Sequence, residues 1–495
     1  MFIEKDKKHK KTFSFFILIF CLFLCIIIGF FWYIFLGNFT GGYSSDSSRE
    51  KAIVTADVPQ EEVLKQSTRV GITDLLRILR TPRTSLVLFL NNTEIRPGGG
   101  FIGSYAVLDT EGVNVVVHKL QGTESLDNYA PKNWRVEPPP MIGRYLGLDR
   151  WYFRDSNWSP DFQVSAKRSL DFYRGEKGVL GDKITTVVGV TPKALEEVLR
   201  IVGPITVQGI EFEADTVVET LEYEVEYGYE ERGISFANRK QIMKPFFDAL
   251  QKKVKNNLFS NIIRYRDLVE RLVREKHILV FVEGDEDDAL RSFAKKIGAG
   301  GEVYRGAGDS VMWVDANLAA LKTDHVMERS LSYVIRPDTS GLGLVAEVTM
   351  HYTHPGLVDW RTSRYKTYAR VFVPEGAELI ESFVRYRGER LVVEDVEIEE
   401  HQEMNKVAFG SFIIVEPGSE KDLTFRYYLP PDVVERVRND GVYSLVTQKQ
   451  IGLDGVSINL DLDFGKPVKD GKKTIDVYTT QSILEHDSKI SLTLE

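Results

Sequence analysis

A glycine-rich stretch combines amide, carboxylate and guanidinium side chains that could bind an anionic ligand. It reads Asn91-Asn92-Thr93-Glu94-Ile95-Arg96-Pro97-Gly98-Gly99-Gly100-Phe101-Ile102-Gly103. In one interpretation Arg96 and nearby backbone N–H groups meet an anionic group. In a second, the stretch is a tight turn with positive φ at one or more glycines. A nucleotide-binding loop is disfavoured because a predicted strand and hairpin follow, where such a loop opens a helix, and no Gly-Lys-Ser/Thr is present.

Two further segments carry candidate side chains. The first, Asp155-Ser156-Asn157-Trp158-Ser159-Pro160-Asp161-Phe162, precedes a helical pattern. Asp155, Asn157, Trp158 and Asp161 form a candidate loop for a sugar or lipid. An Asx-turn and helix N-cap, with Trp158 and Phe162 in the core, fits nearly as well. The second, Asn238-Arg239-Lys240-Gln241, opens a predicted helix, where the dipole disfavours an arginine, although a solvated face also explains it.

Other chemistries lack a signature. The eight histidines have no metal-ligand spacing, and no Gly-x-Ser-x-Gly elbow is present. The sequence therefore predicts neither a metal site nor a recognisable hydrolase nucleophile.

The elements that must position these residues alternate between strand and helix over 68–324. Apolar runs predict strands at Ser85–Leu90, Phe101–Leu108, Val113–Leu120, Ile184–Val190, Ile205–Val207 and His277–Val282. Helical spacing predicts helices at Glu61–Arg80, Leu195–Val202, Asp215–Tyr227, Asn238–Val254 with a kink at Pro245, Asn261–Lys276 and Asp285–Ile297. This pattern indicates an α/β domain with a mixed sheet flanked by helices.

Past about His325 the helical periodicity ends and short β-rich runs recur between turn signals such as Pro417-Gly418 and Pro430-Pro431. Many short strands at this spacing predict an immunoglobulin-like, all-β sandwich over 326–495.

The N-terminal region predicts one transmembrane helix. Residues 12–37 include the uncharged apolar run Phe13–Leu36, which as a helix would extend roughly 36 Å against a hydrocarbon core of about 30 Å. Five lysines precede it in the basic tail 1–11, and no basic residue follows until Arg49. This asymmetry predicts a cytoplasmic N-terminus and extracytoplasmic domains, joined through residues 38–67, a linker and the start of a helix. A cleavable signal peptide is the alternative.

Net charge and cysteine positions limit the ligands and the disulfides that the exported part can have. Removing the +3 of the tail (five lysines against Glu4 and Asp6) from the chain total of −9 leaves −12 on the exported part. This charge argues against nucleic acid. Both cysteines, Cys21 and Cys25, lie in the predicted anchor, so the exported part forms no disulfide.

Four stretches, taken in order, resemble a bacterial, membrane-anchored family known only as domain of unknown function four-zero-one-two. They are Asn91–Arg96 through Gly103–Tyr105, Asn157–Phe162, Gly189–Pro192 through Gly203–Ile205, and Trp313–Leu318. Together they cover roughly Ser85 to Tyr443. The family has no assigned activity, so this resemblance implies an identity and no role.

The order of elements also looks like that of the LytR-CpsA-Psr phosphotransferases. Those enzymes move glycopolymers from a polyprenyl-pyrophosphate carrier to the cell wall, with Mg²⁺ bridging the pyrophosphate. Arg96 matches an arginine of their first loop, and Arg239 matches one arginine of their Arg-x-x-Arg-Gln pattern.

Two acidic positions of those enzymes differ here. Gly99-Gly100 and Gln121-Gly122-Thr123-Glu124 replace them, so Mg²⁺ would need Asp155, Asp161 or Glu124 as substitute ligands. The sequence therefore leaves open whether the protein is an enzyme.

The sequence thus predicts a membrane-anchored envelope protein that binds, and could transfer, an anionic lipid-linked glycopolymer intermediate in cell-wall or surface polysaccharide assembly. Arg96 and Arg239 would grip phosphate oxygens and Asn91, Asn92 and Lys119 would orient the head group, while Gly98, Gly99 and Gly100 allow close approach. This function predicts a deep apolar tunnel ending at both arginines. The alternative is a non-catalytic scaffold or adhesion protein that binds an envelope partner through its sandwich, with a collapsed or polar core in place of the tunnel.

Overall fold

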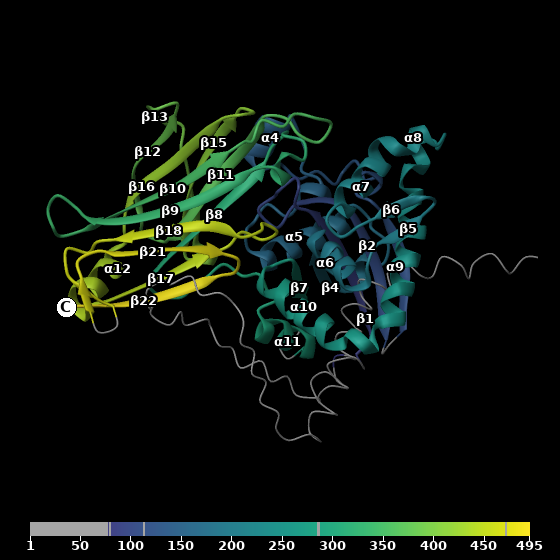
Figure 1. Cartoon of the computed structure of the whole chain (residues 1–495), viewed down its shortest axis with the longest axis horizontal. Coiled ribbons are helices and arrows are strands. Elements are labelled where there is room, and N and C mark those ends of the chain that lie inside the picture. Colours follow the sequence, from purple (N-terminus) through teal and green to yellow (C-terminus); the bar gives the residue numbers. More distant parts are fainter. Residues whose placement is uncertain (1–77, 79–80, 112–113, 285–287, 471–472) are drawn as a thin grey trace, which may run out of the picture.

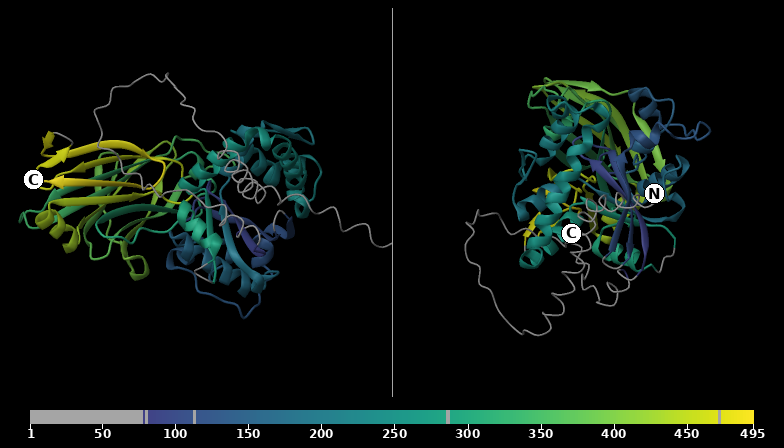
Figure 2. Two further views of the ribbon diagram at one scale, coloured as in Figure 1. Left: turned by 90° about the horizontal axis from the view of Figure 1, so that it is seen from below. Right: turned by 90° about the vertical axis from the view of Figure 1, so that its right-hand side faces the viewer.

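The computed structural model describes residues 78, 81–111, 114–284, 288–470 and 473–495. They form an α/β domain and a β-sandwich that lie side by side, with the C-terminus at the far end of the sandwich (Figures 1 and 2). The predicted anchor and almost all of the predicted helix over Glu61–Arg80 lie outside these residues. Within the described part of the chain, no helix has the length and apolar character needed to span a bilayer.

The α/β domain is built on a five-stranded mixed sheet in the order β3-β2-β1-β4-β7. The strands are β1 (Arg83–Asn91), β2 (Phe101–Glu111), β3 (Asn114–Gly122), β4 (Ile184–Val190) and β7 (Ile278–Val282). Only β1 and β4 pair in parallel. Because both faces of β1 are covered, its sequence is a continuous apolar run: Leu86 and Leu88 pack into one core and Val87 into the other. The predicted mixed sheet is confirmed.

Helices cover both faces of this sheet. One face carries α6 (Lys193–Val202), α7 (Val217–Tyr223), α9 (Met243–Asn257), α10 (Ile262–Arg274) and α11 (Ala289–Ile297). The short helix α8 (Tyr229–Glu231) lies between α7 and α9 along the chain. The other carries α3 (Glu124–Asp127), α4 (Pro140–Leu146) and α5 (Phe162–Gly175). The short strands β5 (Ile205–Val207) and β6 (Ile210–Phe212) pair only with each other.

One predicted helix begins later than expected. Residues Phe236–Ile242 form a 3₁₀ helix that contains Arg239, and α9 starts at Met243. Pro245 therefore lies in the first turn of α9, where its missing N–H removes no helical hydrogen bond, so the predicted kink is wrong.

The second domain packs a seven-stranded sheet on an eight-stranded one, with orders β13-β12-β16-β10-β9-β18-β21 and β14-β15-β11-β8-β17-β22-β19-β20. The first sheet contains β9 (Glu328–Pro337), β10 (Leu344–Thr353), β12 (Glu378–Tyr386), β13 (Glu389–Val392), β16 (Glu420–Tyr428), β18 (Val456–Leu462) and β21 (Tyr478–Leu484). The second contains β8 (Asp309–Asn317), β11 (Tyr365–Pro374), β14 (Glu397–His401), β15 (Lys406–Val415), β17 (Val442–Gln448), β19 (Val468–Asp470), β20 (Lys473–Ile475) and β22 (Ser488–Leu494). A short helix, α12 (Pro431–Glu435), precedes β17. Apolar residues of both sheets share one core.

The β-rich C-terminal region is as predicted, but two details differ. The two sheets exceed the seven to nine strands of an immunoglobulin domain. In addition, β8 is a central strand of the sandwich, so the boundary predicted at 324 falls after the domain has begun. Every residue of β8 is buried, because one face packs in the sandwich core and the other toward the α/β domain. Such a run does not alternate and resembles a strand of an α/β sheet.

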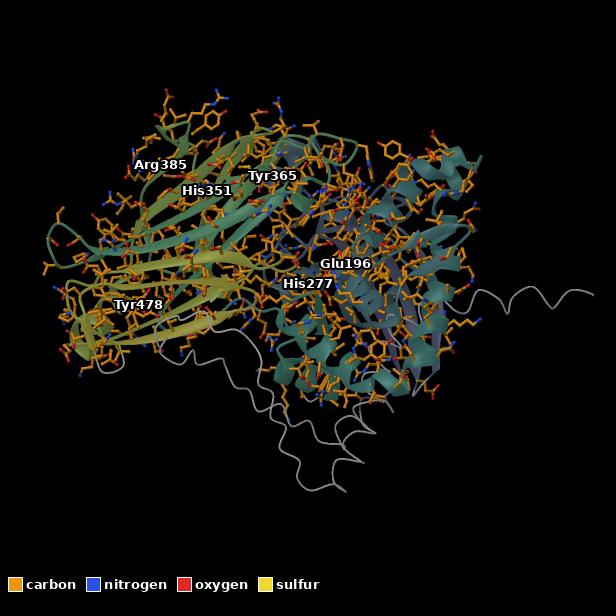
Figure 3. All side chains as sticks on the ribbon, viewed as in Figure 1. Glu196, His277, His351, Tyr365, Arg385 and Tyr478 are labelled. Carbon is orange, nitrogen blue, oxygen red and sulfur yellow. The ribbon has the colours of Figure 1, made fainter. Side chains whose placement is uncertain are left out.

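Both apolar and polar side chains meet at the interface of the two domains. His277 of the α/β domain, labelled in Figure 3, lies 3.8 Å from Asp454 of the sandwich. Beside it the Lys276 ammonium is 2.7 Å from Asp487 and donates to the Lys449 carbonyl. Lys449 is buried and donates to the carbonyl of Leu453. Burial, followed by the charge of Lys276, lowers the pKa of Lys449 from 10.5 to about 7.

Replacing Lys449 by methionine is expected to flatten the pH dependence of stability. Between pH 7 and 10.5 the unfolded chain holds the Lys449 proton and the folded protein does not, so the free energy of unfolding rises with pH. The Lys449→Met variant loses that slope, at most about 1.4 kcal/mol per pH unit. Urea unfolding at several pH values measures it, with exposed Lys252→Met as control. Equal slopes in Lys449→Met and the parent would contradict the assignment.

Candidate functional site

A cavity of about 550 Å³ lies between the sheet and the helices of the α/β domain. Its walls are largely apolar and come from β1, β2, β3, β4, β7, α6, α7, α9 and α10. The wall includes Val87, Leu90, Val188, Val190, Leu195, Val198, Leu221, Phe247, Leu250, Val269 and Ile278. Small residues at Gly103, Ser104, Gly122 and Ala194 leave this space unfilled. Its volume lies within the roughly 300–1,000 Å³ of small-molecule sites.

One end of the cavity is polar. The residues there are Asn91, Glu94, Gln121, Glu124, Glu222, Glu226, Arg239 and Lys322. Asn91 closes β1, and Gln121 lies near the end of β3, so this end lies at the carboxyl ends of these strands. Ligands of open α/β sheets bind at that position. The site therefore suits an amphipathic ligand, with its apolar part inside and its polar part at this end.

Arg239 is the predicted residue that the structure places at this polar end. Its guanidinium lies 3.3 Å from the Glu124 carboxylate and 3.9 Å from the centre of the Phe236 ring. The Arg239 side chain is 10% exposed and that of Glu124 is 61% exposed. Because Glu124 faces solvent, an anionic ligand can replace it as the partner of Arg239.

Lys322 is a second cation at the polar end, and the sequence analysis missed it. It follows β8 in a segment where Ala319 and Leu321 have φ values of 63° and 50°, a conformation that non-glycine residues adopt rarely. Among the described residues, its ammonium has no hydrogen-bond or ion-pair partner within 4 Å. Burial raises the pKa of the nearby Glu94 carboxyl, whereas the charges of Arg96 and Lys322 lower it. No local pattern marks Lys322, because the sandwich brings it to the cavity.

Glu222 joins the two domains at the same end. Its carboxylate accepts a hydrogen bond from the Asn91 amide at 3.1 Å and lies 2.8 Å from the guanidinium of Arg361. Arg361 belongs to the loop between β10 and β11 of the sandwich. The sandwich thus completes the polar end of the cavity.

Arg96 does not line the cavity, contrary to the prediction. Its guanidinium is 3.1 Å from Asp155 and 3.1 Å from Glu94, and it also donates to the carbonyl of Asn317 in the sandwich. Although burial lowers the pKa of Arg96, the charges of Glu94 and Asp155 raise it above its usual value. Its donors already hold the domain interface, so the expected convergence of two arginines on one cavity is wrong.

The glycines of this loop approach protein atoms: Gly99 lies against the sandwich, and Gly98 and Gly100 lie against their own domain. Gly99 and Gly100 have φ values of 114° and 137°, which agrees with the tight-turn interpretation. A Cβ at Gly452 of the sandwich would meet the Gly99 carbonyl, and one at Gly98 would meet Asn157. Protein backbone and side chains therefore occupy the space that the sequence analysis assigned to a phosphate.

The remaining residues predicted to orient the head group lie in different places. Asn91 lines the cavity, but the Asn92 amide donates to the Gly452 carbonyl at 2.8 Å, at the domain interface. Lys119 is exposed and pairs with Val107, which packs on the opposite face of the sheet from the cavity. Lys119 and Asn92 therefore cannot orient a head group there.

The segment Asp155–Phe162 forms an interface and a helix cap. Asp161 caps α5 by accepting from the Val164 N–H and forms a 2.7 Å ion pair with Arg305. Trp158 stacks on Tyr368 of the sandwich, and the Asn157 amide donates to the Gly100 carbonyl. The N-cap interpretation holds, and the loop offers no open surface for a sugar or lipid.

The candidate carboxylates do not assemble a Mg²⁺ site. Asp155 pairs with Arg96, Asp161 with Arg305 and Glu124 with Arg239, in three separate places. Within the described ranges, no three or more His, Cys, Asp or Glu side chains are arranged to hold a metal ion. The residues present therefore do not fit the bridging metal that the second resemblance implied.

Residues 80–226 match the model of a family described as Protein of unknown function (DUF4012). This match confirms the first resemblance for the three stretches between Asn91 and Ile205, whereas Trp313–Leu318 lies beyond it. The likeness to the LytR-CpsA-Psr phosphotransferases stays a prediction. No curated protein matches the chain.

Similarity to solved structures is distant. A Legionella pneumophila protein described as nutrient-binding shares 8% identity at a TM-score of 0.26, over 38% of this chain and 72% of its own. Leukotriene A4 hydrolase from Saccharomyces cerevisiae shares 8% sequence identity at a TM-score of 0.21, over 34% of this chain and 29% of its own. An M1 zinc metallopeptidase from Deinococcus radiodurans shares 10% sequence identity at a TM-score of 0.19, over 34% of this chain and 43% of its own. These likenesses carry no argument about function.

Proposed function

We propose that the α/β domain binds an anionic, lipid-linked glycopolymer intermediate, with the lipid chain in the cavity and the charged head group at its polar end. One observation carries this proposal: a cavity of about 550 Å³ has apolar walls and, at one end, the guanidinium of Arg239 and the ammonium of Lys322, for which the described part of the chain provides no ion-pair partner within 4 Å.

The two parts of such a ligand match the two parts of the site. Each methylene moved from water to the apolar walls contributes about 0.8 kcal/mol, which favours a chain over a compact polar molecule. A phosphate at the polar end would replace Glu124 beside Arg239 and would be the first ion-pair partner of Lys322. Charge-assisted hydrogen bonds of this kind contribute about 1.5–3 kcal/mol each.

The cellular setting belongs to the same proposal. The lysines before the apolar run Phe13–Leu36 support a single-pass anchor with both domains outside the cell membrane. A lipid-linked intermediate of wall or surface polysaccharide assembly would be available there. Because the carboxylates do not gather around a metal position, the proposal covers binding and leaves out transfer.

Removing the Arg239 guanidinium is expected to weaken binding of a charged isoprenoid selectively. The full chain in detergent would be titrated with geranylgeranyl pyrophosphate and with geranylgeraniol, which shares the chain and lacks the phosphates. Both ligands should bind, the pyrophosphate more tightly. In Arg239→Ala or Lys322→Ala the affinity for the pyrophosphate should fall about tenfold or more, while that for the alcohol stays unchanged.

Lys244→Ala is the matched control, because Lys244 lies on α9 next to the cavity-lining Met243 and pairs with Asp248. It removes one positive charge without touching the cavity and should bind both ligands like the parent. Failure of both isoprenoids to bind the parent protein would reject the proposed function. Unchanged pyrophosphate affinity in both variants would reject the head-group site.

A further inference from the structure

Exposed apolar side chains surround the polar end of the cavity. Six of them, here called the apolar rim, are 39–66% exposed: Leu120, Tyr227, Phe236, Leu321, Leu357 and Val358. Single exposed apolar residues are ordinary, but a group around one opening marks a surface that contacts a protein or a membrane.

Contacts and chain neighbours place the rim residues at this opening. Leu120 itself lines the cavity, the Phe236 ring lies under Arg239, and Leu321 precedes Lys322. Tyr227 follows the cavity residue Glu226, and its ring packs against Trp360 at 5.3 Å. Trp360 lies in the same loop as Leu357 and Val358, and its neighbour Arg361 pairs with Glu222. The rim thus comes from both domains and is continuous with the site.

The chain before the described domains allows this face to reach a membrane. Between Leu36, the end of the apolar run, and Ile78 lie 41 residues, which can span at most about 140 Å. The first strand enters the domain at Arg83 and reaches the polar end at Asn91. A tether of this reach lets the rim face the bilayer that holds the apolar run.

The negative charge near the rim disfavours contact with anionic membranes. Glu124, Glu219 and Glu226 lie close to the opening, and the first two are 61% and 58% exposed. These carboxylates would be repelled by anionic lipid, so contact must come from the apolar and aromatic side chains. Tyr and Phe rings with Leu and Val are the residue types that enter a bilayer interface.

We propose that the apolar rim lies in the interface of the lipid bilayer, so that the chain of the ligand passes between bilayer and cavity without crossing water. The proposal rests on the proposed function for the ligand that passes, but the contact of the rim with lipid can be measured separately.

Spin labels on the full chain test the contact. With Cys21 and Cys25 replaced by serine, a nitroxide would be attached through Val358→Cys, Leu321→Cys or the control Val442→Cys, and each protein placed in phosphatidylcholine vesicles. Val442 is 43% exposed and begins β17, where it pairs with Thr493 near the C-terminus. Oxygen dissolves preferentially in the bilayer, whereas a water-soluble nickel complex stays in water. Labels at 358 and 321 should therefore collide often with oxygen and rarely with the nickel complex. The label at 442 should collide often with the nickel complex and rarely with oxygen. Water exposure at all three positions would overturn the proposal.

A second measurement separates the rim from the cavity. Leu357→Asp combined with Val358→Asp should slow uptake of a polyprenyl phosphate from phosphatidylcholine vesicles by about tenfold or more. The same double variant should bind geranylgeranyl pyrophosphate from detergent like the parent, as should the control Val442→Asp. Normal uptake by the double variant would overturn the rim proposal and leave the proposed binding function intact. If the parent protein itself failed to bind geranylgeranyl pyrophosphate in detergent, the proposed binding function would be rejected.

Membrane charge gives the last check. Adding anionic phosphatidylglycerol to the vesicles should leave the shielding of the 358 and 321 labels unchanged or reduce it, because the nearby carboxylates are repelled. Shielding that appears only with anionic lipid would contradict insertion through apolar side chains.

Discussion

The Arg96→Ala variant should lose about 3–5 kcal/mol of unfolding free energy, a large fraction of the total of about 5–15 kcal/mol for a domain. The change removes the 3.1 Å partner of the buried Asp155 carboxylate, which keeps only the more distant Arg154 at 3.6 Å, and it removes the donor to the Asn317 carbonyl across the interface. Burial of a poorly compensated charge is the cause of the loss. Equilibrium unfolding in urea, followed by tryptophan fluorescence, measures it.

The matched control is Arg135→Ala. Arg135 forms a 2.6 Å ion pair with Asp149, but both side chains are exposed, at 62% and 80%, so its removal should cost no more than about 1 kcal/mol. Folded Arg96→Ala protein should still bind geranylgeranyl pyrophosphate. If Arg96→Ala instead kept its stability and lost only binding, Arg96 would belong to the ligand site after all.

Filling the cavity should abolish binding while sparing the fold. Ala194 lies on α6, lines the cavity and is 8% exposed. In Ala194→Phe the added ring can occupy the empty space, so the protein should keep its stability within about 1 kcal/mol, since overpacking costs arise only where no space exists. The ring would displace a bound chain, and the affinity for both geranylgeraniol and its pyrophosphate should fall at least about tenfold.

Ala289→Phe provides the comparison. Ala289 lies on α11, is also 8% exposed and belongs to the same core, but it does not line the cavity. The same added ring should therefore destabilise the protein by about 1–3 kcal/mol and leave binding unchanged. Equal destabilisation by both substitutions would mean that the space beside Ala194 closes in solution.

Local pattern was sufficient for most elements of the α/β domain. The strand at Ile184–Val190 and the hairpin after Gly100 agree with the structure because apolar runs and turn residues act over short stretches. Elements that depend on distant partners were harder to place. The boundary near β8 was missed because its residues are buried on both faces, and the start of α9 because Arg239 forms a 3₁₀ turn before it.

Some residues of the candidate site could likewise be predicted from local sequence, and others could not. Arg239 and Asn91 were predictable from residue type and position, and both line the cavity. Arg96 and the glycines met the same criteria, but their features, a positive charge and a close backbone approach, suit a phosphate and a domain interface equally. Only the fold shows that Asp155 and the sandwich take these groups.

By itself, the sequence determined the mixed α/β sheet, the β-rich C-terminal region and the family match around the glycine-rich loop, because periodicity and turn chemistry are local properties. The tertiary structure alone decided which cations meet the cavity. Arg96 is drawn into the interface by buried carboxylates, whereas Lys322 reaches the opening from the second domain. Such choices depend on which distant surfaces pack together, and that information is not contained in the spacing of neighbouring residues.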